Sequence, residues 1–164
     1  MRRLLSLLFV LSLVARAVVA APLPLEKEVA DLAAGSQVTV VHLWAPWCPN
    51  CRTELRPDGW AKFIGANPAV KFVFVNVWHN GDAGTAILDQ AVLGAQPNFL
   101  ARMHPNGTRK GDGRMTKFLD LPVAWIPATW IYREGQLCYA LDYGEVRFPM
   151  LQQMIDDARA DWSH

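Results

Sequence analysis

The stretch HLWAPWCPNCRTEL, residues 42–55, contains two of the three cysteines in a chain of 164 residues. Two residues separate Cys48 from Cys51, and the apolar, β-branched segment Gln37–Trp44 precedes the pair. We therefore expect a buried strand that ends just before the cysteines and a helix that begins at them. The rest of the sequence has to decide among a structural disulfide, a metal site and a redox-active pair.

Composition restricts the class of protein. The length favours one domain that is large enough to bury a core without disulfides. Hydrophobic residues make up 52% and charged residues 19%, and the formal net charge of +1 argues against a nucleic-acid partner. Three cysteines are an odd number and too few for a disulfide framework, so the close pair and the lone Cys138 need separate explanations.

The N-terminal residues 1–21 have the pattern of a secretory signal peptide. A basic start precedes an apolar run over Leu4–Val14, and small residues follow around Ala20. The run is shorter than the ~20 residues of a membrane span, but Arg16 follows it, so an uncleaved N-terminal anchor stays open as an alternative. We expect export to the periplasm, an oxidising compartment, and a single domain over residues 22–164.

The order of predicted elements indicates an α/β fold. Strands are predicted over Gln37–Trp44, Val70–Trp78, Asn98–Met103, Ala128–Arg133 and Gln136–Leu141. Helices are predicted over Glu26–Ala34, Asn50–Ile64 with a kink at Pro57, Asp82–Leu93, Arg114–Leu119 and Arg147–Trp162. Alternation of strands and helices favours parallel pairing of the first two strands, and a late antiparallel hairpin makes the sheet mixed.

The predicted helix start gives the two cysteines different chemistry. Cys48 would lie at the helix N-terminus, with Pro49 at the first helical position, where free N–H groups and the helix dipole stabilise a thiolate. The pKa of Cys48 should therefore fall below the ordinary thiol value. Cys51 lies one turn later and should be less exposed. Cys48 would attack a partner disulfide, and Cys51 would resolve the mixed disulfide.

The motif WAPWCPNC, residues 44–51, resembles the active-site motif of the thioredoxin superfamily, and residues 126–129 (IPAT) resemble the cis-proline segment of that family. The export signal, the WCPxCR-x-E pattern and the long middle region most resemble the periplasmic TlpA type, which includes the reductases of cytochrome c maturation. The resemblance implies a thioredoxin-like three-layer sandwich with a central mixed β-sheet flanked by helices, and it implies that Pro127 faces the cysteines through a cis bond. It also implies protein thiol or disulfide substrates, a membrane electron donor, and a redox-active disulfide in place of any cofactor.

Four further residues are expected at the site. Trp47 and Pro49 flank the first cysteine and could contact substrate, and the backbone of Ile126 could pair with an extended substrate strand. His42 stands where many thioredoxins carry a buried acidic residue. It could accept the proton of Cys51, or it could be a core histidine bonded to a backbone carbonyl.

Other polar residues have plain structural explanations. Arg52 and Glu54 fit a solvated helix face, and Cys138 fits a buried, inert thiol. The region Gly94–Val123 is irregular in pattern, and its charges fit either a solvated loop or a basic surface for an acidic partner. The basic residues of this region are Arg102, Arg109, Lys110, Arg114 and Lys117.

These features favour an exported thiol–disulfide oxidoreductase that reduces disulfides of periplasmic proteins. The strong oxidants of the superfamily carry CPHC motifs, whereas this chain has the uncharged Asn50 in place of that histidine. A thiol oxidase or isomerase on the same fold is one alternative. A copper-binding module that uses the two thiolates is another, whereas a closed zinc site needs about four ligands, which the sequence does not offer.

Overall fold

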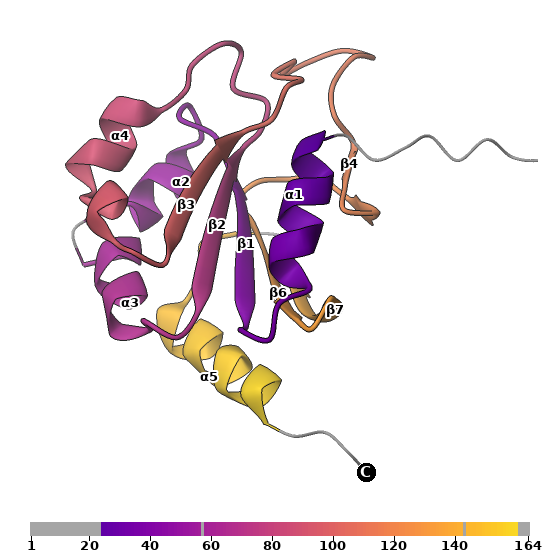
Figure 1. Ribbon diagram of the computed structural model, residues 1–164. Coiled ribbons are helices and arrows are strands. Elements are labelled where there is room, and N and C mark those ends of the chain that lie inside the picture. The colour runs from indigo at the N-terminus through magenta and orange to yellow at the C-terminus, as the bar shows by residue number, and fades with distance from the viewer. Residues whose placement is uncertain (1–23, 57, 143, 161–164) are drawn as a thin grey trace, which may run out of the picture.

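The computed structural model describes residues 24–56, 58–142 and 144–160, and a five-stranded mixed sheet lies at its centre (Figure 1). The strand order is β3-β2-β1-β6-β7, and a small second sheet consists of β4 and β5. The strands are β1 (Thr39–Trp44), β2 (Lys71–Asn76), β3 (Phe99–Met103), β4 (Lys117–Phe118), β5 (Leu121–Pro122), β6 (Ala128–Arg133) and β7 (Gln136–Leu141). The helices are α1 (Pro24–Ala33), α2 (Pro49–Glu54), α3 (Trp60–Ala66), α4 (Thr85–Gln90), the short 3₁₀ helix η1 (Leu93–Ala95) and α5 (Phe148–Arg159).

Strand β1 is the centre of the sheet, and all six of its residues are buried. It pairs in parallel with β2, where Val41 lies opposite Val73, and antiparallel with β6, where Val41 lies opposite Trp130. Such a strand needs apolar side chains on both faces, which explains its continuous rather than alternating hydrophobic pattern. The predicted parallel pair and the predicted late hairpin of β6 and β7 are both confirmed.

Alternate side chains of the central strands fill two cores, one on each face of the sheet. On one face, Val40 and Phe72 belong to a cluster that includes residues of α3 and α5. On the other face, Val41 and Val73 join a cluster that includes residues of α1. Helices therefore cover both faces, and the predicted mixed sheet between helical layers is confirmed (Figure 1).

The predicted helix Asn50–Ile64 is wrong as one element, because the structure has two helices there. Helix α2 ends at Glu54 and helix α3 begins at Trp60. Gly59 makes the connection possible: a Cβ at this position would lie 2.0 Å from the carbonyl oxygen of Glu54. Only glycine allows so close a backbone approach, so the chain turns between the helices instead of kinking within one.

The predicted helix Arg114–Leu119 is also wrong, because residues 117–122 form a small hairpin. Lys117 pairs with Pro122, and Phe118 pairs with Leu121. The two residues between the strands, 119 and 120, have φ values of 48° and 63°, which is the left-handed backbone of a tight two-residue hairpin turn. The buried ring of Phe118 stacks with Trp130 and anchors the hairpin on the main sheet.

Cys138 is exposed, which corrects the prediction of a buried thiol. It lies on β7, which is an edge strand of the sheet, and most side chains of β7 are exposed. An edge strand has only one neighbouring strand, and β7 does not bury all of its side chains as β1 does.

The predicted signal peptide, residues 1–21, lies outside the described residues. Within the described ranges, no helix has the length and apolar character needed to cross a bilayer.

Candidate functional site

The cysteine motif and the cis-proline segment, which the sequence analysis identified, meet where β1 ends and β6 begins. Strand β1 ends at Trp44 and leads into the cysteine motif, while β6 begins at Ala128 directly after the Ile126–Pro127 bond. Because β1 and β6 are antiparallel, with Leu43 opposite Ala128, the end of one strand lies beside the start of the other. The Ile126–Pro127 bond is cis, as predicted.

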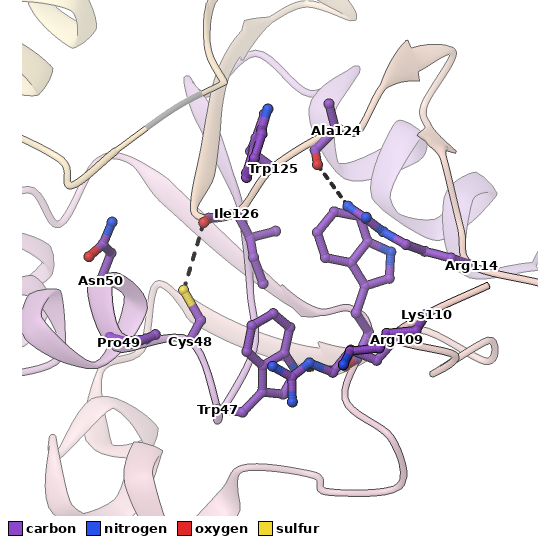
Figure 2. Close-up of a pocket in the computed structure, with 11 residues that line it drawn as sticks. Trp47, Cys48, Pro49, Asn50, Arg109, Lys110, Arg114, Ala124, Trp125 and Ile126 are labelled. Atoms are coloured by element: carbon purple, nitrogen blue, oxygen red, sulfur yellow. Dashed lines mark hydrogen bonds between the residues drawn. The ribbon is translucent and has the colours of Figure 1, made fainter.

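Cys48 caps the N-terminus of α2, as the sequence predicts. Its sulfur accepts a hydrogen bond from the backbone N–H of Cys51 at 3.3 Å, and its thiol lies 3.7 Å from the carbonyl oxygen of Ile126 (Figure 2). Hydrogen bonding from the Cys51 thiol lowers the pKa of Cys48 to about 7, and the backbone N–H groups of Cys51 and Asn50 add to this effect against the cost of burial. Cys48 is therefore the more readily ionised thiol of the pair.

Cys51 has the opposite character. Its side chain is fully buried, and this burial raises its pKa far above the ordinary thiol value. The hydrogen bond to Cys48 and the charges of Cys48 and Glu54 act in the same direction. The pair thus combines a reactive thiol at the pocket with a protonated thiol behind it.

Glu54 is the residue that the sequence interpretation missed. The interpretation placed it on a solvated face, yet it is only 4% exposed, whereas Arg52 is exposed as expected. Its position three residues after Cys51 puts both side chains on the same face of α2. That spacing is the signal that could have identified it.

Burial raises the pKa of Glu54 to about 7, although two donors stabilise its carboxylate. The indole N–H of Trp60 donates to Oε2 at 3.0 Å, and the backbone N–H of Val146 donates to Oε1. The buried thiol of Cys51 is therefore accompanied by a carboxyl group whose pKa is raised to about 7.

His42 lies behind this carboxyl group rather than being bonded to a backbone carbonyl. Its Nε2 is 3.3 Å from Oε2 of Glu54, and its Nδ1 is 2.9 Å from the hydroxyl of Thr129. When Glu54 is ionised, its carboxylate can only accept, so Nε2 then carries the proton and Nδ1 accepts from Thr129. Complete burial lowers the pKa of His42 to about 3, so the ring is neutral.

Glu54 and His42 should have opposite effects on the pH dependence of stability. Folding raises the pKa of Glu54 from 4.5 to about 7, so its contribution to the free energy of unfolding is lost as the pH rises through this range. Folding lowers the pKa of His42 from 6.5 to about 3, so its contribution is complete above pH 6.5 and is lost as the pH falls. The two effects should largely cancel between pH 4.5 and 6.5.

Two single variants should separate these effects. In Glu54→Gln, the free energy of unfolding relative to wild type should rise with pH across this window, by at most about 1.4 kcal/mol per pH unit. In His42→Gln it should fall with pH instead. Urea denaturation at several pH values in this window measures both slopes. Slopes of the same sign would contradict the expectation that Glu54 and His42 have opposite effects on the pH dependence of stability.

The pocket beside Cys48 has a volume of about 440 Å³. Three residues predicted at the site, Trp47, Pro49 and Ile126, line it, whereas His42 does not. The indole N–H of Trp47 donates to the carbonyl oxygen of Trp78 at 2.7 Å, which fixes the ring at the pocket wall. In the described residues, no group of three or more His, Cys, Asp or Glu side chains could hold a metal ion.

Comparison with solved structures identifies the fold. A secreted disulfide oxidoreductase of Mycobacterium tuberculosis, homologous to E. coli DsbE, matches with a TM-score of 0.54 at 22% identity, over 77% of this chain and 85% of that chain. The chain has the thioredoxin fold. A thiol-disulfide isomerase from Corynebacterium glutamicum matches with a TM-score of 0.54 at 16% identity, over 80% of this chain and 86% of that one.

A third similar structure is a thioredoxin-family thiol:disulfide interchange protein from Chlorobium tepidum, with a TM-score of 0.52 at 18% identity, over 79% of this chain and 85% of that one. No protein-family model matches the sequence, and no curated protein matches it either. The thioredoxin fold of this chain is therefore carried by the arrangement of its elements more than by overall sequence similarity.

Proposed function

We propose that this chain is an exported thiol–disulfide oxidoreductase that reduces disulfides of periplasmic proteins through Cys48 and Cys51. The observation that supports this function best is the opposite shift of the two thiol pKa values, with Cys48 lowered to about 7 and Cys51 raised. A structural disulfide does not require thiols of different pKa. Thiol–disulfide exchange does, because one thiolate attacks the substrate disulfide and the other thiol later resolves the mixed disulfide. The similar solved structures include proteins named as a disulfide oxidoreductase and a thiol:disulfide interchange protein.

In the first step, the Cys48 thiolate attacks one sulfur of a substrate disulfide. A bond forms between Cys48 and that sulfur, the substrate disulfide breaks, and the other substrate sulfur leaves with the electron pair and takes a proton. The carbonyl of Ile126, next to the Cys48 sulfur, offers an acceptor to the backbone of an extended substrate.

In the second step, Cys51 must lose its proton before it can attack Cys48. Glu54 is a suitable acceptor, because its carboxyl group titrates near pH 7 and is close enough to raise the pKa of Cys51. The Cys51 thiolate then attacks the Cys48 sulfur, and the bond between Cys48 and the substrate breaks. The substrate sulfur leaves with the electron pair and takes a proton, and an internal disulfide remains. His42, Trp60 and Val146 hold the carboxyl group in place, so His42 acts here as a positioning residue.

Each cycle oxidises the Cys48–Cys51 pair by two electrons, so a reductant must return them. We propose a membrane electron donor for this step, in keeping with export to the periplasm. No further cofactor enters the cycle, because both electrons come from the two thiols.

The reduction potential of the pair tests the proposal. The full chain with Cys138→Ser, which removes the exposed third thiol, would be equilibrated in glutathione buffers and its Cys48–Cys51 disulfide quantified. We expect a potential near that of thioredoxin, about −270 mV, so that the reduced pair can donate electrons. A potential near −120 mV would identify an oxidant, and a pair with no reversible equilibrium would exclude a redox function.

A further inference from the structure

The pocket beside Cys48 has a basic wall. Three of its lining residues are basic, namely Arg109, Lys110 and Arg114, and no aspartate or glutamate is among the described residues that line it. Figure 2 shows the three basic side chains together on the Trp47 side of Cys48, whereas Asn50 lies on the opposite side. A group bound next to the reactive sulfur therefore meets positive charge on one side only.

Two of these cations are held in place by matching tryptophan contacts. The guanidinium group of Arg109 lies over the ring of Trp47, and that of Arg114 lies over the ring of Trp78, each 3.6 Å from the ring centroid. Both rings are fixed in turn by their own hydrogen bonds, because Trp47 donates to the carbonyl of Trp78 and Trp78 donates to the carbonyl of Met115. Stacking fixes a guanidinium plane while its N–H edges stay available for an oxyanion.

The charges of this wall have no acidic partner among the described residues. Arg114 donates one hydrogen bond, from Nη2 to the carbonyl oxygen of Ala124 at 2.7 Å (Figure 2), and its Nε is buried without a partner. The guanidinium groups of Arg109 and Arg114 can give a carboxylate in the pocket charge-assisted hydrogen bonds. The wall is thus complementary to an anion that the chain itself does not supply.

We infer that this wall selects substrate polypeptides that carry carboxylate side chains close to their reactive cysteine. The inference rests on the proposed function and adds the substrate class to it. An extended substrate that pairs with the backbone of Ile126 has its sulfur at Cys48, and the side chains two places before and after its cysteine point to the same face as that sulfur. Those on the Trp47 side meet Arg109 and Arg114, whose fixed geometry suits carboxylates better than a mobile lysine would.

The test uses three synthetic peptides of one sequence, each with a single cysteine in a mixed disulfide with neutral 2-thiopyridine. They differ only in the residues two places before and after the cysteine, which are glutamate, glutamine or lysine. The reduced full chain with Cys138→Ser attacks the peptide sulfur, and release of pyridine-2-thione gives the rate. Each rate is divided by the rate of the same protein with neutral 2-hydroxyethyl disulfide, so that a general loss of reactivity cancels.

We expect the glutamate peptide to react about tenfold faster than the lysine peptide at low ionic strength, with glutamine between them, and added salt to reduce the ratio. The double variant Arg109→Gln/Arg114→Gln should bring the ratio close to one. Arg52→Gln is the matched control, because it removes an exposed positive charge next to Cys51 but outside the pocket, and it should keep the preference.

Equal rates for the glutamate and lysine peptides in the wild type would overturn the inference, and so would an unchanged preference in the double variant. Oxidised glutathione reacting faster than the glutamate peptide would also contradict it, since a small anionic disulfide would then be the better ligand. A reduced protein that fails to react even with 2-hydroxyethyl disulfide would refute the proposed function instead, so the two failures are distinguishable.

Discussion

A Cys48→Ser variant should reduce protein disulfides no faster than the background reaction while remaining folded. The serine hydroxyl is not ionised at neutral pH and cannot form a mixed disulfide, so the first step has no nucleophile. The fold should survive, because Cys48 is the N-cap of α2, where its side chain accepts the N–H of Cys51, and serine is a favoured N-cap residue. Insulin reduction with dithiothreitol as electron source measures the activity, and thermal unfolding monitors the fold.

Cys51→Ser is the matched control, because it removes the resolving thiol and leaves the attacking one. It should consume one equivalent of a peptide disulfide and then stop, with the peptide bound to Cys48 as a mixed disulfide that mass spectrometry identifies. Continued turnover by Cys48→Ser, or trapping of peptide on Cys51 in that variant, would show that the roles of the two thiols are assigned the wrong way round.

A Glu54→Gln variant should resolve the mixed disulfide about a hundredfold more slowly than the wild type, which is the scale of general acid–base catalysis. Glutamine has almost the same shape and keeps one acceptor oxygen, which can serve either Trp60 or Val146, but it cannot take a proton from Cys51. In the wild type, the rate of the second step should rise with pH through about 7, as Glu54 ionises. In the variant this rise should be absent.

Rapid-mixing kinetics with a fluorescent peptide disulfide separates attack from release. Glu145→Gln provides the comparison, because Glu145 is an exposed carboxylate whose charge raises the pKa of Glu54, and its loss should leave the second step fast. If Glu54→Gln also releases peptide at the wild-type rate, Cys51 loses its proton by another route.

The fold and the cysteine pair could be predicted because their signals are local. A continuous apolar run predicts a buried central strand, and a proline after Cys48 predicts a helix start, so neither prediction needs distant parts of the chain. The cis bond before Pro127 was expected only through the resemblance to a family. Turns were harder to predict: the hairpin of β4 and β5 depends on positive φ at Leu119 and Asp120, and a leucine gives no sign of that backbone.

The environment of Glu54 could not be predicted from local pattern. On α2 alone this side chain looks like any exposed glutamate next to an arginine. Its burial comes from His42, Trp60 and Val146, which lie on β1, on α3 and before α5. In the same way, only the tertiary structure brings Arg109 and Arg114 onto two tryptophans.

A peptide of residues 42–55 would contain both thiols, the histidine and the glutamate, yet the chemistry described above would be absent from it. Without Trp60, Thr129 and the amide of Val146, the carboxyl group and the imidazole would be hydrated and would titrate at ordinary values. The redox motif is therefore only the nucleophile of this protein. The proton acceptor that we propose for Cys51 is a product of the assembled tertiary structure, so on this proposal a nascent or partly unfolded chain would expose its thiols before it could use them.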